Sequence, residues 1–380
     1  MASSTESKNG ECRGRAGRRH QKRAARLRRA ARSPQHARSR RPVRHAEVVG
    51  CYEQELAAWF DARFAVACSS GTAAIHLSLL ALDVGPGTEV IVPATAPAMT
   101  ALPVLAVGAV PVFADVAHPA TFALDVADVA GKFTPRTKAV IAVPMWGYPA
   151  DGPELARACC DWGVPLVEDA AQAHGTSLSG RYAGTQGAIG AFSTHARKLI
   201  CTGEGGFCLT SDPALADQLR QLRNLGQPTG GGEFGVGFGL NYKLSALAAA
   251  LGRVQLSRLT DRLTRRRFIL GKLTTMASEI AGLEKFPITF GTEPNGYAAL
   301  FTAEPDLASR IAHRSRAAGI ESDVLRYDYR PLYRTPVLAR YAPTQPCRNT
   351  ERLAVTLLTV PCHERVATDD LARIGAAWRG

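Results

Sequence analysis

The sequence predicts an α/β protein, with a large domain on a mainly parallel β-sheet followed by a smaller α+β domain. Short runs of valine, isoleucine and alanine alternate with helical segments between residues 64 and 167, which is typical of parallel strands buried on both faces. The chain has 380 residues, of which 46% are hydrophobic, and this is enough for one large and one small domain. We expect the large domain over residues 46–259 and the C-terminal domain over 260–380.

The individual elements follow from hydrophobic patterns taken in chain order. Residues 51–60 have helical periodicity, and residues 64–68 (FAVAC) form a short apolar strand that leads into an apolar helix ending near residue 82. We expect further strands at 89–92, 110–114, 139–143, 165–167 and 207–210, and helices at 100–107 and 152–162. One long helical pattern covers 245–278, and residues 305–318 are helical within the C-terminal domain.

The net charge of +13 comes entirely from the N-terminal segment. Residues 1–45 contain 15 lysines and arginines and 2 acidic residues, whereas the rest of the chain contains 31 of each. Because this segment has few apolar residues to bury, we expect it to be disordered. Binding of nucleic acid by a basic arm is the open alternative. The charge therefore says little about the activity of the remaining chain.

Two further features limit the class of protein. The sequence has no apolar run of about eighteen residues, so no membrane contact is predicted. Its nine cysteines form no CxxC pair and no spacing with histidine that suits a metal ion. We therefore expect reduced thiols in a cytoplasmic protein, without a zinc site.

Three loops after predicted strands carry polar residues, and ligands bind beyond the carboxyl ends of parallel strands. The first loop is Ser69-Ser70-Gly71-Thr72, at the start of a helix. Its backbone N–H groups and its hydroxyls suit a phosphate. Ser-Gly-Thr is also an ordinary helix cap, so this loop alone is a weak indication.

The second loop runs from Glu168 to Gly175, directly after an apolar strand. Carboxylates at the end of a buried strand are costly without a partner. Asp169 could hold the N–H of a heteroaromatic ring, and the small Ala171 would let a flat ring lie against the backbone. For an isolated aspartate, helix capping and surface charge are the plainer explanation.

The third loop contains Lys198, between a hydroxyl-bearing turn at Ser193 and Thr194 and a glycine-rich turn at 203–206. A single lysine is usually a solvated surface group, but a buried lysine has a depressed pKa and can form an imine. A phosphate cradle, a carboxylate and an imine-forming lysine are together the parts of a pyridoxal-phosphate site. The combination is far more specific than any one loop.

The chain resembles the DegT/DnrJ/EryC1/StrS family of sugar aminotransferases, which have the fold-type I architecture of pyridoxal-phosphate enzymes. The resemblance implies transfer of an amino group with pyridoxal 5'-phosphate as cofactor. The matching stretches, which follow one another in order between residues 51 and 259, are SSGTAAIHLSLLAL, GAVPVFADV, VEDAAQAHG, GAFSTHARKLICTGEGG and GLNYKLSALAAALGRVQL.

By this resemblance, two residues are catalytic and two more hold the cofactor ring. Lys198 carries the cofactor as a Schiff base, and Asp169 is the partner of the pyridine nitrogen. Gln172 hydrogen-bonds the phenolic oxygen, and Ala171 lies against the ring.

The resemblance also implies a phosphate site and a dimer. Gly71, Thr72 and Ser193 would hold the phosphate of the cofactor. Asn241 would reach the phosphate of the cofactor in the neighbouring subunit, which implies a homodimer with shared active sites. His195 is expected near the site, without a defined role.

The sequence departs from the family pattern in two places. Pro97, in the loop 93–99, stands where members usually place an aromatic residue over the cofactor ring, so we expect weaker stacking or stacking from elsewhere. The N-terminal segment that helps to cover the substrate in the family is arginine-rich here.

The glycine-rich stretch 230–239 lacks the strand and the spacing of a dinucleotide fingerprint, and we interpret it as a loop leading to Asn241.

The resemblance leaves two classes of substrate for the acceptor ketone. Family members act chiefly on nucleotide-linked keto-sugars, or on free keto-cyclitols with glutamine as donor. The segment 326–334 (RYDYRPLYR) is closer to the scyllo-inosose type aminotransferases of aminoglycoside antibiotic pathways. We therefore favour transfer from L-glutamine, or L-glutamate, to a keto-cyclitol of that type, with a nucleotide-linked keto-sugar as the alternative. Arg326, Arg330 and Arg334 are candidates for binding the donor carboxylate or the substrate, although some are expected to be surface residues.

Particular residues argue against other functions. A cofactor-dependent sugar dehydratase of this fold carries histidine where this chain has Lys198. The combination of Lys198, Asp169 and Gln172 disfavours a non-enzymatic, nucleic-acid-binding regulator. A degraded paralogue, suggested by Pro97 and the unusual N-terminus, would fail to retain the cofactor.

Overall fold

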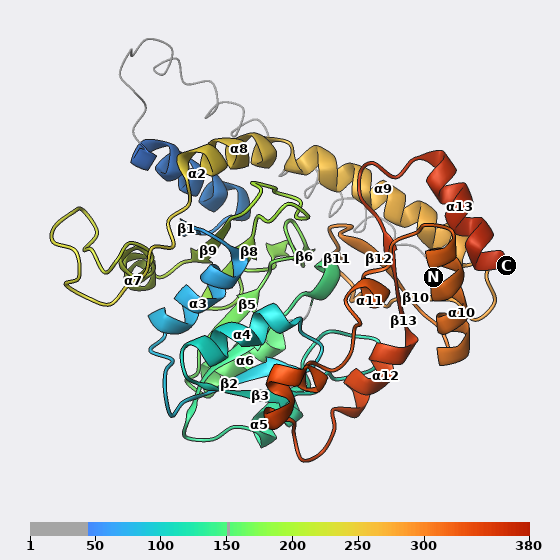
Figure 1. Ribbon diagram of the computed structural model, residues 1–380, viewed down its shortest axis with the longest axis horizontal. Coiled ribbons are helices and arrows are strands. Elements are labelled where there is room, and N and C mark those ends of the chain that lie inside the picture. Colours follow the sequence, from blue (N-terminus) through green and yellow to red (C-terminus); the bar gives the residue numbers. More distant parts are fainter. Residues whose placement is uncertain (1–44, 150–152) are drawn as a thin grey trace, which may run out of the picture. The chain divides into compact units, whose positions relative to one another are not determined.

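The computed structural model describes residues 45–149 and 153–380 (Figure 1). The disorder and the basic arm predicted for residues 1–45 fall on residues 1–44, which lie outside this description. The main sheet has seven strands in the order β1-β9-β8-β5-β4-β2-β3. β9 is antiparallel to both of its neighbours, and the other neighbouring strands are parallel. The strands are β1 Phe64–Cys68, β2 Glu89–Pro93, β3 Val110–Ala114, β4 Thr137–Ala142, β5 Leu166–Asp169, β8 Ile189–Ser193 and β9 Gly206–Thr210.

Both faces of this sheet are covered by helices, as the continuous apolar strands predict. Along β2, Val90 and Val92 belong to one hydrophobic cluster and Ile91 belongs to another, because successive side chains of a strand point to opposite faces. The first cluster includes α3 (Gly71–Ala81) and α4 (Ala98–Ala106), and the second includes α5 (Val126–Gly131) and α6 (Pro153–Asp161). The prediction of a mainly parallel α/β sheet is confirmed.

The helical pattern predicted over residues 245–278 is helical in the structure, but it is divided into two helices. α8 (Ala246–Ser257) and α9 (Leu259–Ala277) are separated at Arg258, whose backbone N–H bonds the carbonyl of Gln255. α8 lies beside α2 (His45–Phe60), as Figure 1 shows, whereas α9 contacts the C-terminal strands. The apolar pattern of the sequence continues across Arg258, so the sequence does not reveal the break. The break becomes evident in the structure, where α8 and α9 pack against different elements. The predicted domain boundary at 259 lies next to the break and stays a prediction.

The C-terminal part is built on a three-stranded antiparallel sheet, β10-β12-β13. The ring of Phe301 in β12 packs edge-on against Trp378 in α13, with 5.2 Å between their centroids. α10 and α13 lie side by side over this sheet (Figure 1). The elements are β10 Glu284–Lys285, β12 Ala298–Thr302, β13 Leu357–Pro361, α10 Pro305–Ala317, α11 Asp323–Arg326, α12 Arg348–Thr356 and α13 Thr368–Arg379.

A few short elements complete the described chain. A small antiparallel sheet joins β11 (Thr292–Glu293), β6 (Ser177–Leu178) and β7 (Arg181–Tyr182), and α7 (Pro213–Arg223) follows β9. The segment 326–346 is mostly loop, with two 3-10 turns at Leu332–Arg334 and Pro336–Tyr341. None of the helices in the described ranges is long and apolar enough to cross a lipid bilayer.

The topology brings the three polar loops to one edge of the sheet. β5 and β8 are parallel neighbours, and β1 runs in the same direction because β9 is antiparallel to both β1 and β8. The loops after β1, β5 and β8 therefore all leave the carboxyl edge, where an open parallel sheet binds its ligands.

Candidate active site

A cavity of about 270 Å³ lies at this edge of the sheet. Of the residues predicted to hold the cofactor, all but Asn241 line it, and His195 lines it as well. The predicted residues in its wall are Gly71, Thr72, Asp169, Ala171, Gln172, Ser193, His195 and Lys198.

One end of the cavity is formed by the first turn of α3. The hydroxyl of Ser70 caps this helix by accepting the N–H of Ala73 at 3.0 Å. The first N–H groups of a helix have no acceptor within the helix, so those of Gly71 and Thr72 can meet an anion. A Cβ atom on Gly71 would lie 2.6 Å from the Cβ of Ser193, so glycine alone lets α3 approach the end of β8 this closely. This end of the cavity suits a phosphate.

Asp169 ends β5 and is buried at the base of the cavity. Burial raises the pKa of its carboxyl group. Three neighbours oppose that rise by favouring the ionised form: the hydroxyl of Thr100 at 2.6 Å, the N–H of Ala171 at 3.2 Å and the charge of Lys198. A carboxylate held in this way can accept the N–H of a protonated heteroaromatic ring.

The side chain of Gln172 is oriented by the backbone of Trp146, whose N–H donates to Oε1 at 2.6 Å. Because the oxygen already has a donor, the NH₂ group of Gln172 is available to donate to a ligand. Trp146 has a φ of 51°, which is unusual for a bulky residue, and its indole N–H donates to Asp323 at 3.2 Å. The side chain of Asn295 donates to the carbonyl of Gln172 at 2.8 Å and so also holds this loop.

Lys198 lies on the loop after β8, and its ammonium nitrogen is 5.4 Å from the ring centroid of Tyr297. Burial lowers the pKa of this amine, and the charges of Asp169 and Asp323 act against that shift. A lowered pKa leaves more of the amine in its neutral, nucleophilic form near pH 7. The local conditions are therefore those of an imine-forming lysine.

Pro97 lines the cavity at the position where the family pattern places an aromatic residue. The surrounding wall supplies other apolar contacts for a flat ring. These come from Ile75, Met99, Val143 and Met145, with the rings of Tyr297 and Tyr327 near Lys198. Sequence reasoning did not find Tyr297, which carries no motif. Tyr327 lies in the segment 326–334, of which only the arginines were proposed as binding residues.

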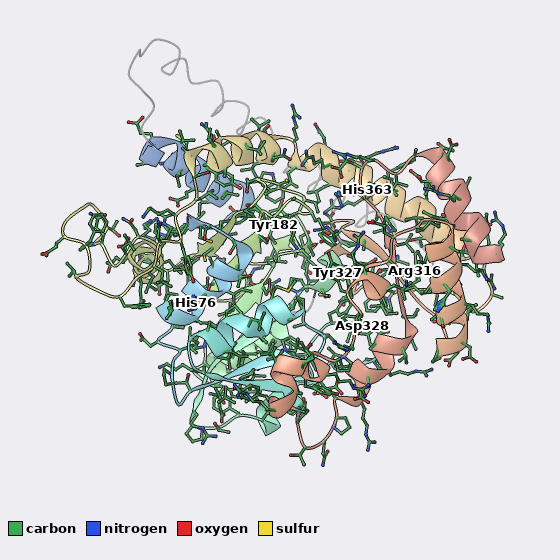
Figure 2. The ribbon with its side chains drawn as sticks, viewed as in Figure 1. His76, Tyr182, Arg316, Tyr327, Asp328 and His363 are labelled. Carbon is green, nitrogen blue, oxygen red and sulfur yellow. The ribbon has the colours of Figure 1, made fainter. Side chains whose placement is uncertain are left out.

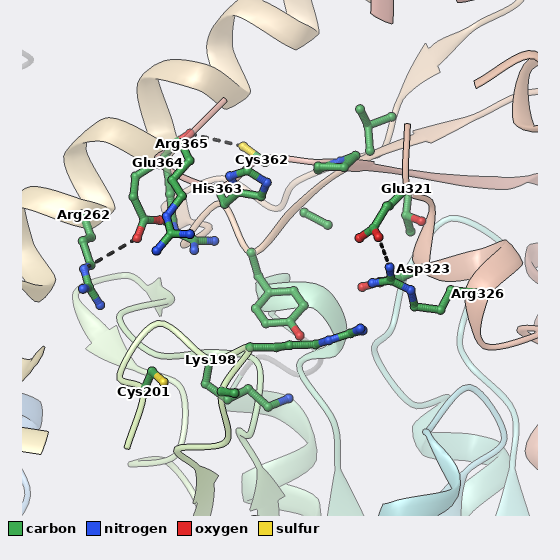
Figure 3. Close-up of a pocket in the computed structure, with 18 of the residues that line it drawn as sticks. Lys198, Cys201, Arg262, Glu321, Asp323, Arg326, Cys362, His363, Glu364 and Arg365 are labelled. Atoms are coloured by element: carbon green, nitrogen blue, oxygen red, sulfur yellow. Dashed lines mark hydrogen bonds and ion pairs between the residues drawn. The ribbon is translucent and has the colours of Figure 1, made fainter. Parts of the chain in front are cut away.

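A second, larger cavity of about 500 Å³ adjoins the first and shares Arg197, Lys198 and Tyr297 with it (Figure 3). Besides Lys198, its wall holds five arginines and three carboxylates. The arginines are Arg197, Arg262, Arg266, Arg326 and Arg365, and the carboxylates are Glu321, Asp323 and Glu364.

Two of these carboxylates are already neutralised by ion pairs. Glu364 lies 2.7 Å from Arg266 and 3.6 Å from Arg262, and Glu321 pairs with Arg326. Over residues 45–149 and 153–380, neither Arg197 nor Arg365 forms an ion pair with a carboxylate. The larger cavity is therefore locally positive and suits an anionic ligand.

Some of the predicted binding residues lie outside both cavities. Arg330 pairs with Asp328 at 2.8 Å, and Arg334 pairs with Glu351 at 2.6 Å. Figure 2 labels Asp328 on the loop after α11, beside Tyr327. Of the three arginines proposed from the sequence, only Arg326 lines a cavity that contains Lys198.

Asn241 and His195 have different surroundings from each other. Asn241 is exposed, forms a backbone bridge with Asn224, and is absent from the walls of both cavities. His195 lines the smaller cavity, with its Nε2 3.7 Å from Glu204. In its own chain, Asn241 is thus not part of the site.

The smaller cavity matches the chemistry of pyridoxal phosphate. It offers helix N–H groups and a hydroxyl for the phosphate, a carboxylate for the ring nitrogen, an amide donor for the phenolic oxygen and an amine for the aldehyde carbon. Across the described residues, no cluster of three histidine, cysteine, aspartate or glutamate side chains is placed to hold a metal ion.

Comparison with known proteins gives the family. Residues 32–379 match the DegT/DnrJ/EryC1/StrS aminotransferase family. GDP-perosamine synthase of Caulobacter vibrioides is 31% identical over 330 residues, covering 86% of this chain and 88% of that protein. L-glutamine:2-deoxy-scyllo-inosose aminotransferase of Streptomyces kanamyceticus is 37% identical over 251 residues, covering 63% of this chain and 58% of that protein.

A solved structure extends the likeness to three dimensions. The aminotransferase TlmJ from Streptoalloteichus hindustanus superimposes with a TM-score of 0.79 at 32% identity, covering 89% of this chain and 90% of that one. Sequence and structure therefore agree over nearly the whole described region. The chain belongs to the DegT/DnrJ/EryC1/StrS aminotransferase family and is a pyridoxal-phosphate-dependent aminotransferase.

Proposed function

We propose that this enzyme transfers an amino group from glutamine or glutamate to the ketone of a nucleotide-linked keto-sugar, with Lys198 as the catalytic lysine. The observation that carries the proposal is the position of Lys198 between two cavities. On one side lies the wall that suits pyridoxal phosphate, and on the other lies a larger, positively charged space.

In this proposal the residues of the smaller cavity hold the cofactor and move protons. When bound, the cofactor supplies an aldehyde carbon that condenses with amines and a ring that takes up the electrons released at the substrate carbon. The ionised Asp169 holds the ring N–H, and Gln172 donates to the phenolic oxygen. Burial favours the neutral form of the Lys198 amine, and in this form Lys198 accepts the proton from the substrate carbon.

The larger cavity is the argument for a phosphate-bearing acceptor. Arg197 and Arg365 are not engaged by carboxylates within the described chain. Guanidinium groups bind phosphates and carboxylates with paired hydrogen bonds. The same arginines could receive the carboxylate of the donor first and the diphosphate of the acceptor afterwards, since the two substrates react in turn.

A free keto-cyclitol of the scyllo-inosose type is the second candidate. It is supported by the 37% identity to the Streptomyces kanamyceticus enzyme and by the segment 326–334. Such an acceptor is smaller and uncharged, and it leaves the arginines of the larger cavity only the donor carboxylate to bind. This difference in charge separates the two candidates by experiment.

We also propose a homodimer in which Asn241 completes the phosphate site of the partner subunit. Asn241 lies outside the cavities of its own chain and is exposed. Large apolar side chains are exposed before and after it in the sequence, and a gathering of such side chains marks an interaction surface. They are Phe234, Val236 and Phe238 on the preceding loop and Leu247, Leu251 and Val254 on α8.

The test of the acceptor is an assay of the purified, cofactor-loaded enzyme with glutamine and glutamate as donors. Nucleotide-linked keto-sugars and keto-cyclitols are offered separately, and mass spectrometry detects the aminated product. We expect amination of a nucleotide-linked sugar. Exclusive amination of a keto-cyclitol would establish the second candidate instead.

Arginine variants link the result to the larger cavity. Arg365→Gln should lower kcat/KM for a phosphate-bearing acceptor by roughly 10- to 100-fold, which corresponds to one lost hydrogen bond to a charged group. Arg373→Gln is the matched control, because Arg373 is a surface arginine of α13 paired with Asp370. Equal kinetics for both variants would argue against an anion site in this cavity.

A further inference from the structure

The carboxylate of Asp169 is bonded by a residue that lies outside the sequence stretches in which the family resemblance was found. Thr100 lies in the first turn of α4 and has no exposed surface. Its hydroxyl donates to Oδ2 of Asp169 at 2.6 Å, and this bond joins residues 69 positions apart in the chain. The backbone N–H of Thr100 donates to the carbonyl of Pro97 at 3.0 Å, which fixes the start of α4.

The two oxygens of Asp169 are held by different elements. Oδ2 accepts the hydroxyl of Thr100, and Oδ1 accepts the backbone N–H of Ala171 at 3.2 Å. Two donors on two oxygens fix the rotation of the carboxylate plane, which neither donor fixes alone. Each oxygen keeps a further lone pair for a ligand.

We propose that Thr100 is a positioning residue of this enzyme, whose hydroxyl keeps Asp169 ionised and aimed at the ring nitrogen of the cofactor. The inference rests on the proposed role of Asp169 and adds to it. A hydroxyl donating to an ionised carboxylate forms a short, strong hydrogen bond, and 2.6 Å lies in that range. Burial disfavours the charged carboxylate, so its ionisation depends on donors such as this one.

The charge of Lys198 also favours ionised Asp169. When Lys198 is joined to the cofactor and later released, its interaction with Asp169 changes, whereas the hydroxyl of Thr100 stays in place. Thr100 therefore supports the carboxylate through both half-reactions. Its loss should lower kcat for the donor and acceptor half-reactions by similar factors and leave KM for either substrate nearly unchanged.

The central variant is Thr100→Val, which removes the hydroxyl at nearly constant volume. Thr100→Ser restores the donor and is expected to behave like the native enzyme. The matched control is Thr95→Val, five residues earlier. Thr95 is 1% exposed, and its hydroxyl has no hydrogen-bond partner among the described residues. Thermal unfolding of each apo-protein shows whether the variant folds, and Thr100→Ala serves if the valine is not accommodated.

Two measurements separate positioning from a merely structural role. The first is the dissociation constant of pyridoxal phosphate for the apo-protein, and the second is the pH titration of the visible spectrum of the loaded enzyme. For Thr100→Val we expect cofactor binding to weaken by roughly 10-fold or more, with a shifted spectral titration. We expect Thr95→Val and Thr100→Ser to stay within about twofold of the native enzyme.

The result that would overturn the proposal is a folded Thr100→Val protein with the cofactor affinity and spectrum of Thr95→Val. Asp169→Asn distinguishes this from a failure of the underlying site. If Asp169→Asn leaves affinity and spectrum unchanged, the proposed role of Asp169 is wrong. If Asp169→Asn has a large effect, Thr100→Val should add little to it in the double variant, because the hydroxyl acts through that carboxylate.

Discussion

Lys198 illustrates how one residue acquires its chemistry from burial. Its amine lies between Asp169, from the parallel sheet, and Asp323, from the C-terminal part, and both charges act on it. Burial nevertheless outweighs these two charges and lowers its pKa. The burial that makes this amine more reactive therefore also lowers the stability of the folded apo-protein.

This cost gives a prediction for Lys198→Met in the apo-protein. Because burial places the folded pKa below the unfolded one, the native lysine destabilises the fold at pH values below the unfolded pKa. We expect Lys198→Met to raise the free energy of unfolding by on the order of 1 kcal/mol at pH 7. The gain should shrink as pH rises towards 10, where the unfolded lysine also loses its proton. Urea unfolding at several pH values measures this, with the exposed Lys138→Met as control.

His174 gives a prediction for the stability of the protein at acidic pH. Its ring is fully buried against Phe192 and Phe207, and burial, with the charges of Lys198 and Arg266, lowers its pKa to about 3. The unfolded chain takes up this proton below about pH 6.5 and the folded chain does not. The free energy of unfolding should therefore fall as pH drops from about 6.5 towards 3.

The variant His174→Leu should lose this part of the acid sensitivity. Thermal unfolding of the apo-protein between pH 7 and 4 measures it, and the exposed His313→Leu is the control. An unchanged pH dependence in His174→Leu, with both proteins folded at pH 7, would show that His174 does not carry the effect.

At the scale of elements, the contact between α3 and β8 shapes the phosphate end of the cavity. The two elements meet at Gly71 and Ser193, where a Cβ atom on Gly71 would be only 2.6 Å from the Cβ of Ser193. The first turn of α3 keeps its N–H groups directed at the cavity only while this approach is preserved. Residue 71 therefore matters for packing as well as for its own N–H.

We predict that Gly71→Ala moves the start of α3 and weakens binding of pyridoxal phosphate. Overpacking of this kind costs about 1–3 kcal/mol, so the dissociation constant should rise roughly 5- to 150-fold. Gly50→Ala in α2 is the control, because a Cβ atom there meets nothing within 4 Å. Fluorescence titration of both apo-proteins with the cofactor provides the comparison. Equal affinities would mean that α3 does not contribute to the phosphate site.

The elements also show what the sequence could and could not reveal. Six of the seven strands of the main sheet and the three polar loops were predicted, since buried parallel strands are apolar throughout and ligand loops follow them. β8 (Ile189–Ser193) was not among the predicted strands. The break at Arg258 was not predicted, because the helical pattern continues through it. Thr100 and Tyr297 were missed because each looks like an ordinary core residue until the fold places it beside Asp169 or Lys198.

At the scale of the whole molecule, positive charge is distributed very unevenly. Residues 1–45 carry all of the net charge, and the rest of the chain is balanced. Within that balanced part, the cavity beside Lys198 still has five arginines and only three carboxylates. The local arrangement, which total charge does not reveal, favours an anionic substrate.

The proposed dimer predicts that two defective variants restore activity when mixed. Lys198→Met lacks the catalytic amine, and Asn241→Ala lacks the proposed contact to the partner's phosphate site. In a mixed dimer, the site that keeps Lys198 receives Asn241 from the other subunit and is complete. At limiting cofactor, mixing and reassembly should recover up to about a quarter of native activity. If Asn241 served its own subunit, no activity would return.

The central claim is that Lys198 is the residue that carries the cofactor. Its most direct test is to load the purified protein with pyridoxal phosphate, record the absorption spectrum, reduce with borohydride and locate the label by peptide mass spectrometry. The account predicts the absorption band of a protonated imine and a single pyridoxyl group on Lys198. An unlabelled protein, or a label on another lysine, would contradict it.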